Sequence, residues 1–298
     1  MKKILIAGGS GLLGLNSTLY LSNIGYEIFA SSHNKSIKDI EFAQFFEIDL
    51  TNFKNSSDLI NLIKPDLVMN FAGLTNVEEC ERNPNLARRL NVDICGNLSK
   101  ISSNLDIPFL HMSTDHLFSN SQNSYDEEDA TCPINLYSKT KLESEKLALS
   151  ENNKSLVIRA NFFCTSTIYK SSFIDNIVTN LNNGDKVELF DDVCFSPILF
   201  SYLLDYALSL IKKNHYGIYH VSSDEKISKY KFGCLLSNFL KMKSELIIPI
   251  SIDDKDLVRR PYNMALKNTK LKKTLNIQIP TLTEQFKNYF DKYNYNNI

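Results

Sequence analysis

Several patterns that mark particular classes of protein are missing from this chain. Its 298 residues contain no Trp, no CxxC pair among the six Cys, and no pair of His at the spacing of helical metal ligands. We therefore expect free buried thiols and no catalytic metal. No stretch approaches the roughly 18 apolar residues of a membrane-spanning helix. The formal net charge of −1 comes without a basic patch for nucleic acid, so we expect a cytoplasmic protein with neither membrane nor nucleic-acid partners.

The first residues, MKKILIAGGSGLLG, superficially resemble a secretion signal because two lysines precede an apolar run. Gly8, Gly9, Gly11 and Gly14 interrupt that run after about four apolar residues, which is too short for the apolar region of a signal. We therefore expect this segment to belong to the folded protein.

The first half of the chain alternates short apolar or β-branched runs with amphipathic stretches. This pattern is typical of βαβ units and predicts an α/β fold, a Rossmann-type doubly wound parallel sheet. Functional residues should gather where its strands end. The ranges expected as strands are 3–7, 26–32, 45–48, 67–72, 109–113 and 156–160, and those expected as helices are 12–24, 56–63, 85–103 and a stretch from 134 onward.

After residue 160 the pattern changes to longer helical runs at 172–184, 201–213 and 231–240, with short strand-like pieces between them. We expect an NAD(P)-binding domain over residues 1–160, to which residues around 190–222 return. Residues 161–298 should form mainly a smaller α/β lobe for the substrate. No Pro-rich or Gly/Ser-rich linker separates the two parts, which predicts a continuous body with a cleft.

A glycine-rich turn, GGSGLLG, follows the first expected strand and opens the first expected helix. Glycines there let the backbone turn tightly and approach a pyrophosphate, which then lies at the helix N-terminus. The turn therefore predicts a dinucleotide cofactor. Its expected contacts are Gly8, Ser10, Gly11, Leu12, Leu13 and Gly14.

The ends of the next two strands bear on the choice of cofactor. The second ends in ASSHNK, without the acidic residue that binds ribose hydroxyls in NAD-preferring sites. Ser31, Ser32 and Lys35 suit a 2′-phosphate, although an ordinary solvated loop has the same composition. We therefore expect NADP(H), with NAD(H) as the alternative. Asp49, followed by Leu50, is placed to accept from an adenine amine or to cap the next helix, and both roles can coexist.

The fourth expected strand runs into NFAGLT. Phe71 and Ala72 are expected beneath the adenosine side of the cofactor, and Gly73 lets this loop pass close to a ligand. Thr75 of the same loop is expected to contact the cofactor as well. Asn91 lies on the following helix, either as an amide near the reaction centre or as an ordinary surface residue.

Thr114, Tyr137 and Lys141 stand at the spacings of a carbonyl-reducing site. If the chain is helical from Ile134, Tyr137 and Lys141 share one helix face, and the ammonium should lower the phenol's pKa from its usual value of about 10. A Tyr-x-x-x-Lys pair is expected about once by chance in a chain with 14 Tyr. The pair gains its weight from the glycine-rich turn upstream.

The segments GGSGLLG, NFAGLTNVEECE, STDHLF, YSKTKLESE and RRPYNMAL, in this order, resemble the extended short-chain dehydrogenase/reductase superfamily. Within it they resemble the dTDP-4-dehydrorhamnose reductase family, along nearly the whole chain. The resemblance implies NAD(P)H-dependent reduction of a 4-keto-6-deoxy nucleotide sugar in the synthesis of surface polysaccharide precursors. It also implies that Thr114 hydrogen-bonds the keto oxygen, Tyr137 donates the proton, and Lys141 holds the nicotinamide ribose while tuning Tyr137.

The same resemblance implies further contacts around these three residues. Met112 and Ser113 would line the nicotinamide side, Asn91 would be a structural or proton-relay residue, and Arg159 would lie near the cofactor and the sugar nucleotide. A guanidinium at the RRPYNMAL segment would grip the nucleotide diphosphate, since its fork suits phosphate oxygens. The implied substrate contacts are Thr114, Asp115, Asn161, Ser196 and Arg260.

Other activities of the superfamily stay open to different degrees. A sugar-nucleotide dehydratase would need Asp-Glu directly after Thr114, where this chain has Asp115 and His116, so dehydration is disfavoured. Epimerisation can reuse the same Tyr and cofactor and remains an alternative. Some relatives instead serve as regulatory subunits of methionine adenosyltransferase. The resemblance also implies a homodimer through residues 86–101 and 137–149, with a monomer as the alternative.

Overall fold

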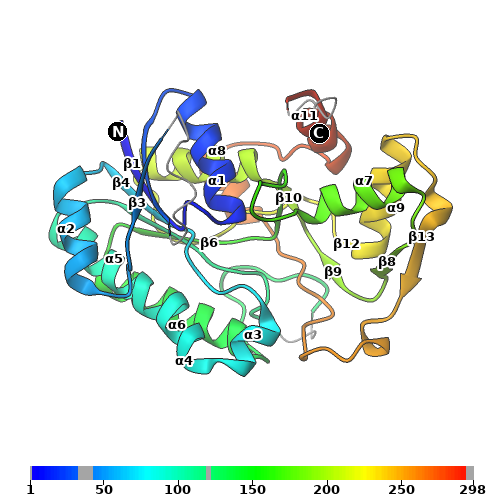
Figure 1. Ribbon diagram of the computed structural model, residues 1–298, viewed down its shortest axis with the longest axis horizontal. Coiled ribbons are helices and arrows are strands. Elements are labelled where there is room, and N and C mark those ends of the chain that lie inside the picture. The colour runs from blue at the N-terminus through cyan, green and yellow to red at the C-terminus, as the bar shows by residue number, and fades with distance from the viewer. Residues whose placement is uncertain (1, 33–42, 119–121, 293–298) are drawn as a thin grey trace.

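The structure is a computed structural model that describes residues 2–32, 43–118 and 122–292; Lys35 lies outside these ranges. A seven-stranded sheet with every strand parallel to its neighbours forms its larger half (Figure 1). From one edge to the other the strands are β11 (Gly217–His220), β6 (Ser155–Arg159), β5 (Phe109–Met112), β4 (Leu67–Asn70), β1 (Lys3–Ala7), β2 (Glu27–Ser32) and β3 (Ala43–Glu47).

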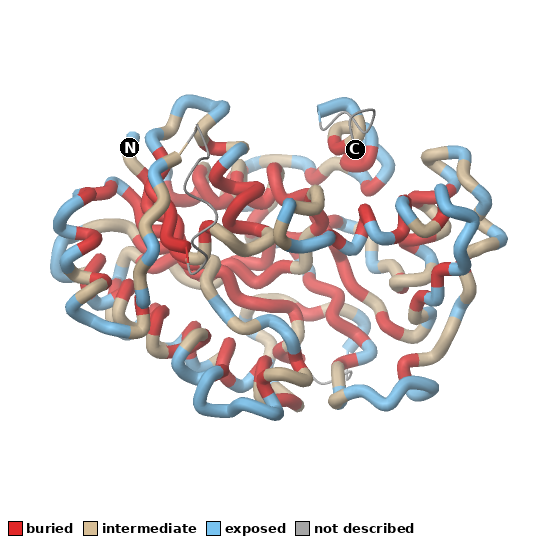
Figure 2. Tube along the Cα trace, in the orientation of Figure 1, coloured by how far each residue is buried: buried red, intermediate tan, exposed pale blue. Residues whose placement is uncertain are grey.

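Alternate side chains of the central strand β1 enter two separate hydrophobic clusters, because successive residues of a strand face opposite sides of the sheet. Ile4 and Ile6 pack with residues of α1 and α8, whereas Leu5 and Ala7 pack with residues of α2 and α5. Helices therefore cover both faces, as Figures 1 and 2 show, and the predicted fold class is confirmed. These helices are α1 (Leu12–Asn23), α8 (Phe200–Lys212) and α10 (Thr269–Leu275) on one face, and α2 (Phe53–Ile63), α5 (Ile94–Asn104) and α6 (Leu136–Glu151) on the other.

The connection from β4 to β5 differs from the single helix expected over 85–103. It begins with α3 (Val77–Arg82), which Asn76 caps by accepting from the Glu79 amide at 2.8 Å. Pro84 then starts the short helix α4 (Pro84–Arg88), because proline fits a first helical turn but not a helix interior. A π-helical turn, η2 (Arg89–Asp93), follows and leads into α5.

The smaller lobe packs helices against pairs of short strands. Its core is aromatic: the ring of Phe232 meets the rings of Phe163 and Phe286 edge to face. The helices are α7 (Phe173–Asn183), α9 (Lys229–Phe239), α11 (Leu282–Lys292) and the 3₁₀ turns η3 (Ser244–Leu246) and η4 (Ile252–Asp254). The strand pairs are β8 (Val187–Phe190) with β13 (Ile247–Ile250), β9 (Cys194–Phe195) with β12 (Ile227–Ser228), and β7 (Phe162–Phe163) with β10 (Ile198–Leu199).

The chain passes between the two halves more than once. After β10 it enters α8, which packs against α1, and then β11, which pairs with β6 at the sheet edge. The domain limits at residue 160 and around 190–222 stay predictions, since one hydrophobic cluster extends through both halves. Among the residues the structure describes, no helix is long and apolar enough to cross a membrane.

Candidate active site

The glycine-rich turn lies beside the point where the strand order reverses, between β1 and β4. Gly8 has a φ of 82°, and a Cβ there would lie 2.7 Å from the Ala72 backbone. A Cβ at Gly14 would lie 2.0 Å from the carbonyl oxygen of Gly8. The backbone packing excludes side chains at both positions, and Gly11 stands at the N-terminus of α1. This is the geometry that a dinucleotide pyrophosphate requires.

The end of β2 is tied to this turn. The Gly8 amide donates to Ser31 Oγ at 3.0 Å, and the Gly9 amide donates to the Ser31 carbonyl at 2.8 Å. Ser31 and Ser32 are both buried. The hydroxyl of Ser31 therefore helps to hold the glycine turn in place.

Asp49 does not cap the helix that follows it. Its carboxylate accepts from the amide and the hydroxyl of Thr51, at 2.9 and 2.7 Å, and so closes a turn. Asn52 is the cap of α2, where its side chain accepts from the Asn55 amide. The neighbouring Leu50 is buried in the core.

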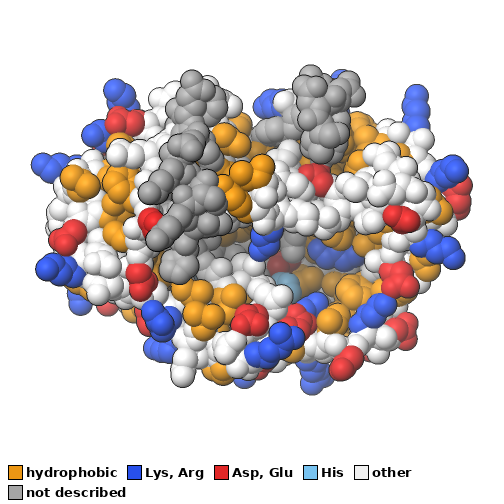
Figure 3. Space-filling view, in the orientation of Figure 1, with side chains coloured by type: hydrophobic (Ala, Val, Ile, Leu, Met, Phe, Trp, Pro, Cys, Tyr) orange, Lys and Arg blue, Asp and Glu red, His pale blue; other side chains and the backbone are white. Residues whose placement is uncertain are grey.

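A cavity of about 340 Å³ runs from the glycine-rich turn to the end of β5, and Figure 3 shows the hollow on this face of the molecule. It brings together most of the residues predicted for the site. Those that line it are Gly11, Leu12, Leu13, Phe71, Ala72, Gly73, Thr75, Asn91, Met112, Ser113, Thr114, Asp115, Tyr137, Lys141 and Asn161. The predicted residues outside this lining are Gly8, Ser10, Gly14, Ser31, Ser32, Asp49, Leu50, Ser196 and Arg260.

Other residues line the cavity without having been predicted as contacts. His116 directly follows the predicted Asp115, and Phe162 and Phe163 directly follow the predicted Asn161. The stretch after β7 carried no recognisable signal, since its residues form no motif and come close to the site only through the tertiary fold. The added lining residues are His116, Ala160, Phe162, Phe163, Cys164, Lys170, Ser172 and Phe173.

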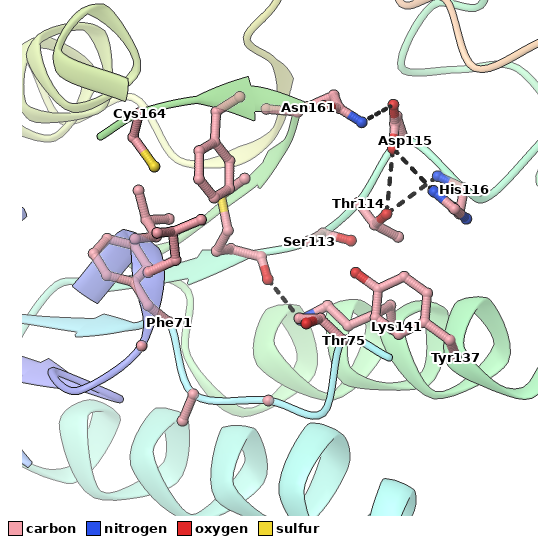
Figure 4. Close-up of a pocket in the computed structure, with 18 of the residues that line it drawn as sticks. Phe71, Thr75, Ser113, Thr114, Asp115, His116, Tyr137, Lys141, Asn161 and Cys164 are labelled. Carbon is pink, nitrogen blue, oxygen red and sulfur yellow. Dashed lines mark hydrogen bonds and ion pairs between the residues drawn. The ribbon is translucent and has the colours of Figure 1, made fainter. Parts of the chain in front are cut away.

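Tyr137 lies in the first turn of α6. Asn135 caps this helix by accepting from the Ser138 amide at 2.9 Å, and the Ser138 side chain completes a capping box. The Tyr137 ring is buried and meets the His116 ring edge to face, with the ring centroids 5.6 Å apart. Its hydroxyl points toward Thr114 in the cavity (Figure 4).

Burial raises the pKa of Tyr137 to about 12, and the hydrogen bond with Thr114 acts in the opposite direction. The sequence had led us to expect a lowered pKa from the neighbouring ammonium. The structure differs because Lys141 directs its ammonium elsewhere while desolvation disfavours the phenolate. Tyr137 is therefore a protonated phenol at neutral pH.

Lys141 extends from α6 to the end of β5. Its Nζ donates to the Met112 carbonyl at 2.6 Å and lies 3.3 Å from Nε2 of the buried His111. Burial lowers the pKa of Lys141 to about 8, opposed by the charges of Cys95 and Glu145. An ammonium has three donors, so Lys141 keeps donor capacity for a ligand in the cavity that it lines.

The residues after β5 form one hydrogen-bonded group at the cavity (Figure 4). Asp115 accepts from Nδ2 of Asn161 at 3.0 Å. The amide of His116 donates to Thr114 Oγ1 at 3.2 Å, and His116 Nε2 lies 3.9 Å from the Asp115 carboxylate. Burial lowers the pKa of His116, which the charge of Asp115 opposes. The carboxylate thus holds Asn161 beside the Thr114 hydroxyl.

Asn91, on the π-helical turn, acts as a clamp in this structure. Its Oδ1 accepts from the Leu74 amide at 2.7 Å, and its Nδ2 donates to the Leu74 carbonyl and to Thr140 Oγ1. A Cβ at Gly73 would lie 2.8 Å from that Oδ1, which explains the glycine. Asn91 therefore joins the loop after β4 to α6, the helix of Tyr137.

Arg159 lies beneath the site instead of in it. Its guanidinium donates to both carboxylate oxygens of Glu145, with the shortest N–O distance 2.7 Å. Both side chains are at most 3% exposed. Ser113 Oγ also donates to Glu145, so this buried ion pair joins α6, β6 and the end of β5.

A second cavity of about 310 Å³ adjoins the first and shares Thr75 and His116 with it. Arg260 lines this second cavity, where one guanidinium NH2 donates to Glu78. Ser196 is buried and is not among the described residues that line either cavity. The described residues also contain no group of three or more His, Cys, Asp and Glu that could hold a metal ion.

The doubly wound sheet, its glycine-rich turn and the Thr-Tyr-Lys cavity define a dinucleotide-binding protein of the short-chain dehydrogenase/reductase superfamily. The chain belongs to the RmlD substrate binding domain family, which it matches over residues 1–295.

Curated relatives include two reductases and a subunit of methionine adenosyltransferase. The chain is 27% identical to a probable low-salt glycan biosynthesis reductase of Haloferax volcanii, over 94% of each chain. It is also 27% identical to a dTDP-4-dehydrorhamnose reductase of Aggregatibacter actinomycetemcomitans, over 93% of this chain and 95% of that one. The subunit beta of methionine adenosyltransferase 2 of Xenopus tropicalis is 25% identical over 91% of this chain and 82% of its own length.

A solved structure of similar shape is that of dTDP-4-dehydrorhamnose reductase from Bacillus anthracis in complex with NADP. It superposes with a TM-score of 0.87, covers 98% of this chain and all of its own, and is 22% identical. At that identity the likeness supports the fold.

Proposed function

We propose that this protein is an NAD(P)H-dependent reductase of a 4-keto-6-deoxy nucleotide sugar, similar to dTDP-4-dehydrorhamnose reductase. The observation that carries the proposal is the buried Tyr137 phenol, which faces Thr114 in a cavity that begins at the glycine-rich turn. Membership of the RmlD family and the reductases among its relatives support the same activity.

The residues at the cavity suit carbonyl reduction. When bound, the reduced nicotinamide supplies a hydride to the keto carbon. Tyr137 gives its phenolic proton to the keto oxygen, which becomes the new hydroxyl, and Thr114 donates a hydrogen bond to the same oxygen as charge develops on it. The raised pKa of Tyr137 keeps this proton on the phenol at neutral pH.

The cofactor contacts follow from the lining of the cavity. We propose that Lys141 uses its remaining donor capacity for the nicotinamide ribose, and that the backbone at Gly11 meets the pyrophosphate. We also propose a preference for NADP(H) over NAD(H), on the basis of Ser31 and Ser32 at the end of β2 and the absence of an acidic residue there.

For the sugar nucleotide we propose contacts with Asp115 and Asn161 at the keto sugar and with Arg260 beyond it. Ser196 is the weakest of the sequence-based contacts, because it is buried outside the lining of both cavities. A role in surface polysaccharide precursors, a cytoplasmic location and a homodimer stay predictions from the sequence.

Replacing Tyr137 with Phe tests the proposed chemistry, because Phe keeps the packing of the ring and removes only its hydroxyl. With dTDP-4-dehydrorhamnose as substrate, kcat for NADPH oxidation should fall about 100- to 10,000-fold, the usual contribution of a positioned acid. NADPH affinity should stay unchanged. Tyr206→Phe is the matched control, because Tyr206 lies on α8 and is not among the residues that line the cavity.

Equal turnover by wild type and Tyr137→Phe would contradict the catalytic assignment. A wild-type protein that binds NADPH, reduces no keto sugar and co-purifies with a larger enzyme would instead favour a regulatory subunit. The same assay compares kcat/KM for NADPH and NADH, and a ratio below one would reject the cofactor preference.

A further inference from the structure

Lys229, the first residue of α9, lines the second cavity and has no counter-ion among the residues that the structure describes. Its Nζ lies 3.3 Å from the ring centroid of Phe195 and 5.1 Å from that of Phe173. Within residues 2–32, 43–118 and 122–292, this ammonium has no hydrogen-bond or ion-pair partner. The faces of two aromatic rings stabilise its charge, but they leave its N–H donors available.

The other charges at the second cavity do not compensate Lys229. Arg260 and Glu78 pair with each other, so their charges cancel. Asp115 is the acidic residue whose charge acts on Lys229, but it already accepts from Asn161 and lies beyond ion-pair distance. The described lining of this cavity therefore carries one net positive charge.

Two further polar atoms at this cavity lack a partner among the residues that the structure describes. They are Nε of Arg260 and Nδ1 of His116. A buried polar atom without a hydrogen bond is destabilising unless a ligand or water completes it. Together with Lys229, these atoms come from three separate segments of the chain and border one cavity.

The order of the two cavities indicates which part of a nucleotide sugar reaches Lys229. The proposed function places the keto carbon at Thr114 and Tyr137 in the first cavity. In a nucleotide sugar the diphosphate is attached to the anomeric carbon, so it is the next group along the molecule. The two cavities lie side by side, since Thr75 and His116 line both of them.

We propose that Lys229 binds the diphosphate of the nucleotide-sugar substrate, and that it supplies the positive charge which Arg260, paired with Glu78, does not. This inference rests on the proposed function. Burial lowers the pKa of Lys229 to about 8, so the side chain is mainly a cation at neutral pH. Its partial burial also strengthens the interaction with an anion, because the local dielectric is low.

Calorimetric titration of the full-length protein with dTDP, UDP and thymidine tests the proposal. Lys229→Ala should bind the nucleoside diphosphate about 10- to 100-fold more weakly, the range that one charge-assisted hydrogen bond implies. Thymidine should bind both proteins equally. Lys229→Arg should retain most of the affinity, since it keeps the charge. Lys231→Ala, exposed on the same helix, is the matched control. Unchanged circular dichroism and NADPH binding would show that each variant is folded.

The remaining outcomes each have a definite meaning. Equal nucleoside diphosphate affinity in wild type and Lys229→Ala would overturn this inference, while turnover of a keto sugar by wild type would leave the proposed function intact. The same titration with UDP-glucuronate and UDP-glucose identifies another outcome. If Lys229→Ala loses affinity for UDP-glucuronate alone, Lys229 binds a sugar carboxylate, and the diphosphate inference is overturned. If wild type binds neither dTDP nor UDP and reduces no keto sugar, both proposals fail.

Discussion

Replacing Glu145 with Gln should lower the free energy of unfolding by about 3–5 kcal/mol, the cost of breaking a buried ion pair by removing one partner. Glutamine keeps the shape of the side chain but removes its charge. Arg159, only 3% exposed, would then be buried without a counter-ion. Ser113 would also lose a carboxylate acceptor. For a protein of this size, a loss of this magnitude corresponds to a fall in Tm of roughly 6–15 °C.

A second glutamate on the same helix provides the control. Glu143, two residues earlier, pairs with Arg88 at 2.6 Å, but their side chains are 45% and 56% exposed. Exposed pairs contribute at most about 1 kcal/mol, so Glu143→Gln should unfold nearly as the wild type does. The double variant Glu145→Gln/Arg159→Met should recover part of the stability, because it also removes the uncompensated charge.

Urea unfolding followed by circular dichroism measures these differences at neutral pH. If Glu145→Gln and Glu143→Gln have free energies of unfolding within about 1 kcal/mol of each other, burial does not make the Arg159–Glu145 pair more important for stability than an exposed pair. A further readout is kcat, because Ser113 precedes Thr114 and is held by Glu145. We expect Glu145→Gln to lower kcat while Glu143→Gln leaves it unchanged.

Two other substitutions test the cofactor turn and the buried lysine. Gly14→Ala should weaken NADPH binding at least about tenfold, because the added Cβ meets the Gly8 backbone; Gly96→Ala, which meets only the Leu147 side chain, should bind normally. Lys141 has a pKa near 8 in the folded protein instead of 10.5. Between these two pH values the unfolded chain binds a proton that the folded protein has lost, so the free energy of unfolding rises as the pH rises. Lys141→Met should therefore be more stable than wild type below pH 8, and this advantage should shrink by up to about 3 kcal/mol by pH 10.5; a constant difference in urea unfolding would contradict it.

The parts of the fold that follow from local sequence were predictable. Alternating apolar runs located the strands of the first half, and the glycine-rich turn and the Tyr137–Lys141 pair are defined by short, fixed spacings. All of these are read within one strand or one helix. Their agreement with the structure reflects how strongly backbone geometry and burial constrain such local patterns.

The rest depends on contacts between distant segments. Arg260 and Glu78 are 182 residues apart, so no local pattern indicates that the guanidinium is already paired. Lys229 follows a short polar stretch and resembles an ordinary surface lysine in the sequence. The raised pKa of Tyr137 arises from desolvation, which depends on the packing of the whole site. Arg159 ends a strand, as the site residues do, yet it faces the buried side of α6.

The return of the chain to the sheet makes the two halves interdependent for folding. Without residues beyond 160, β6 would become an edge strand with unpaired backbone groups, and α1 would lose the apolar cover of α8. Ile4 of the first strand and Phe286 of the last helix belong to the same hydrophobic cluster. The walls of the cleft therefore share one core, so its width is set by side-chain packing and the two walls cannot move apart as separate hinged bodies without breaking that core.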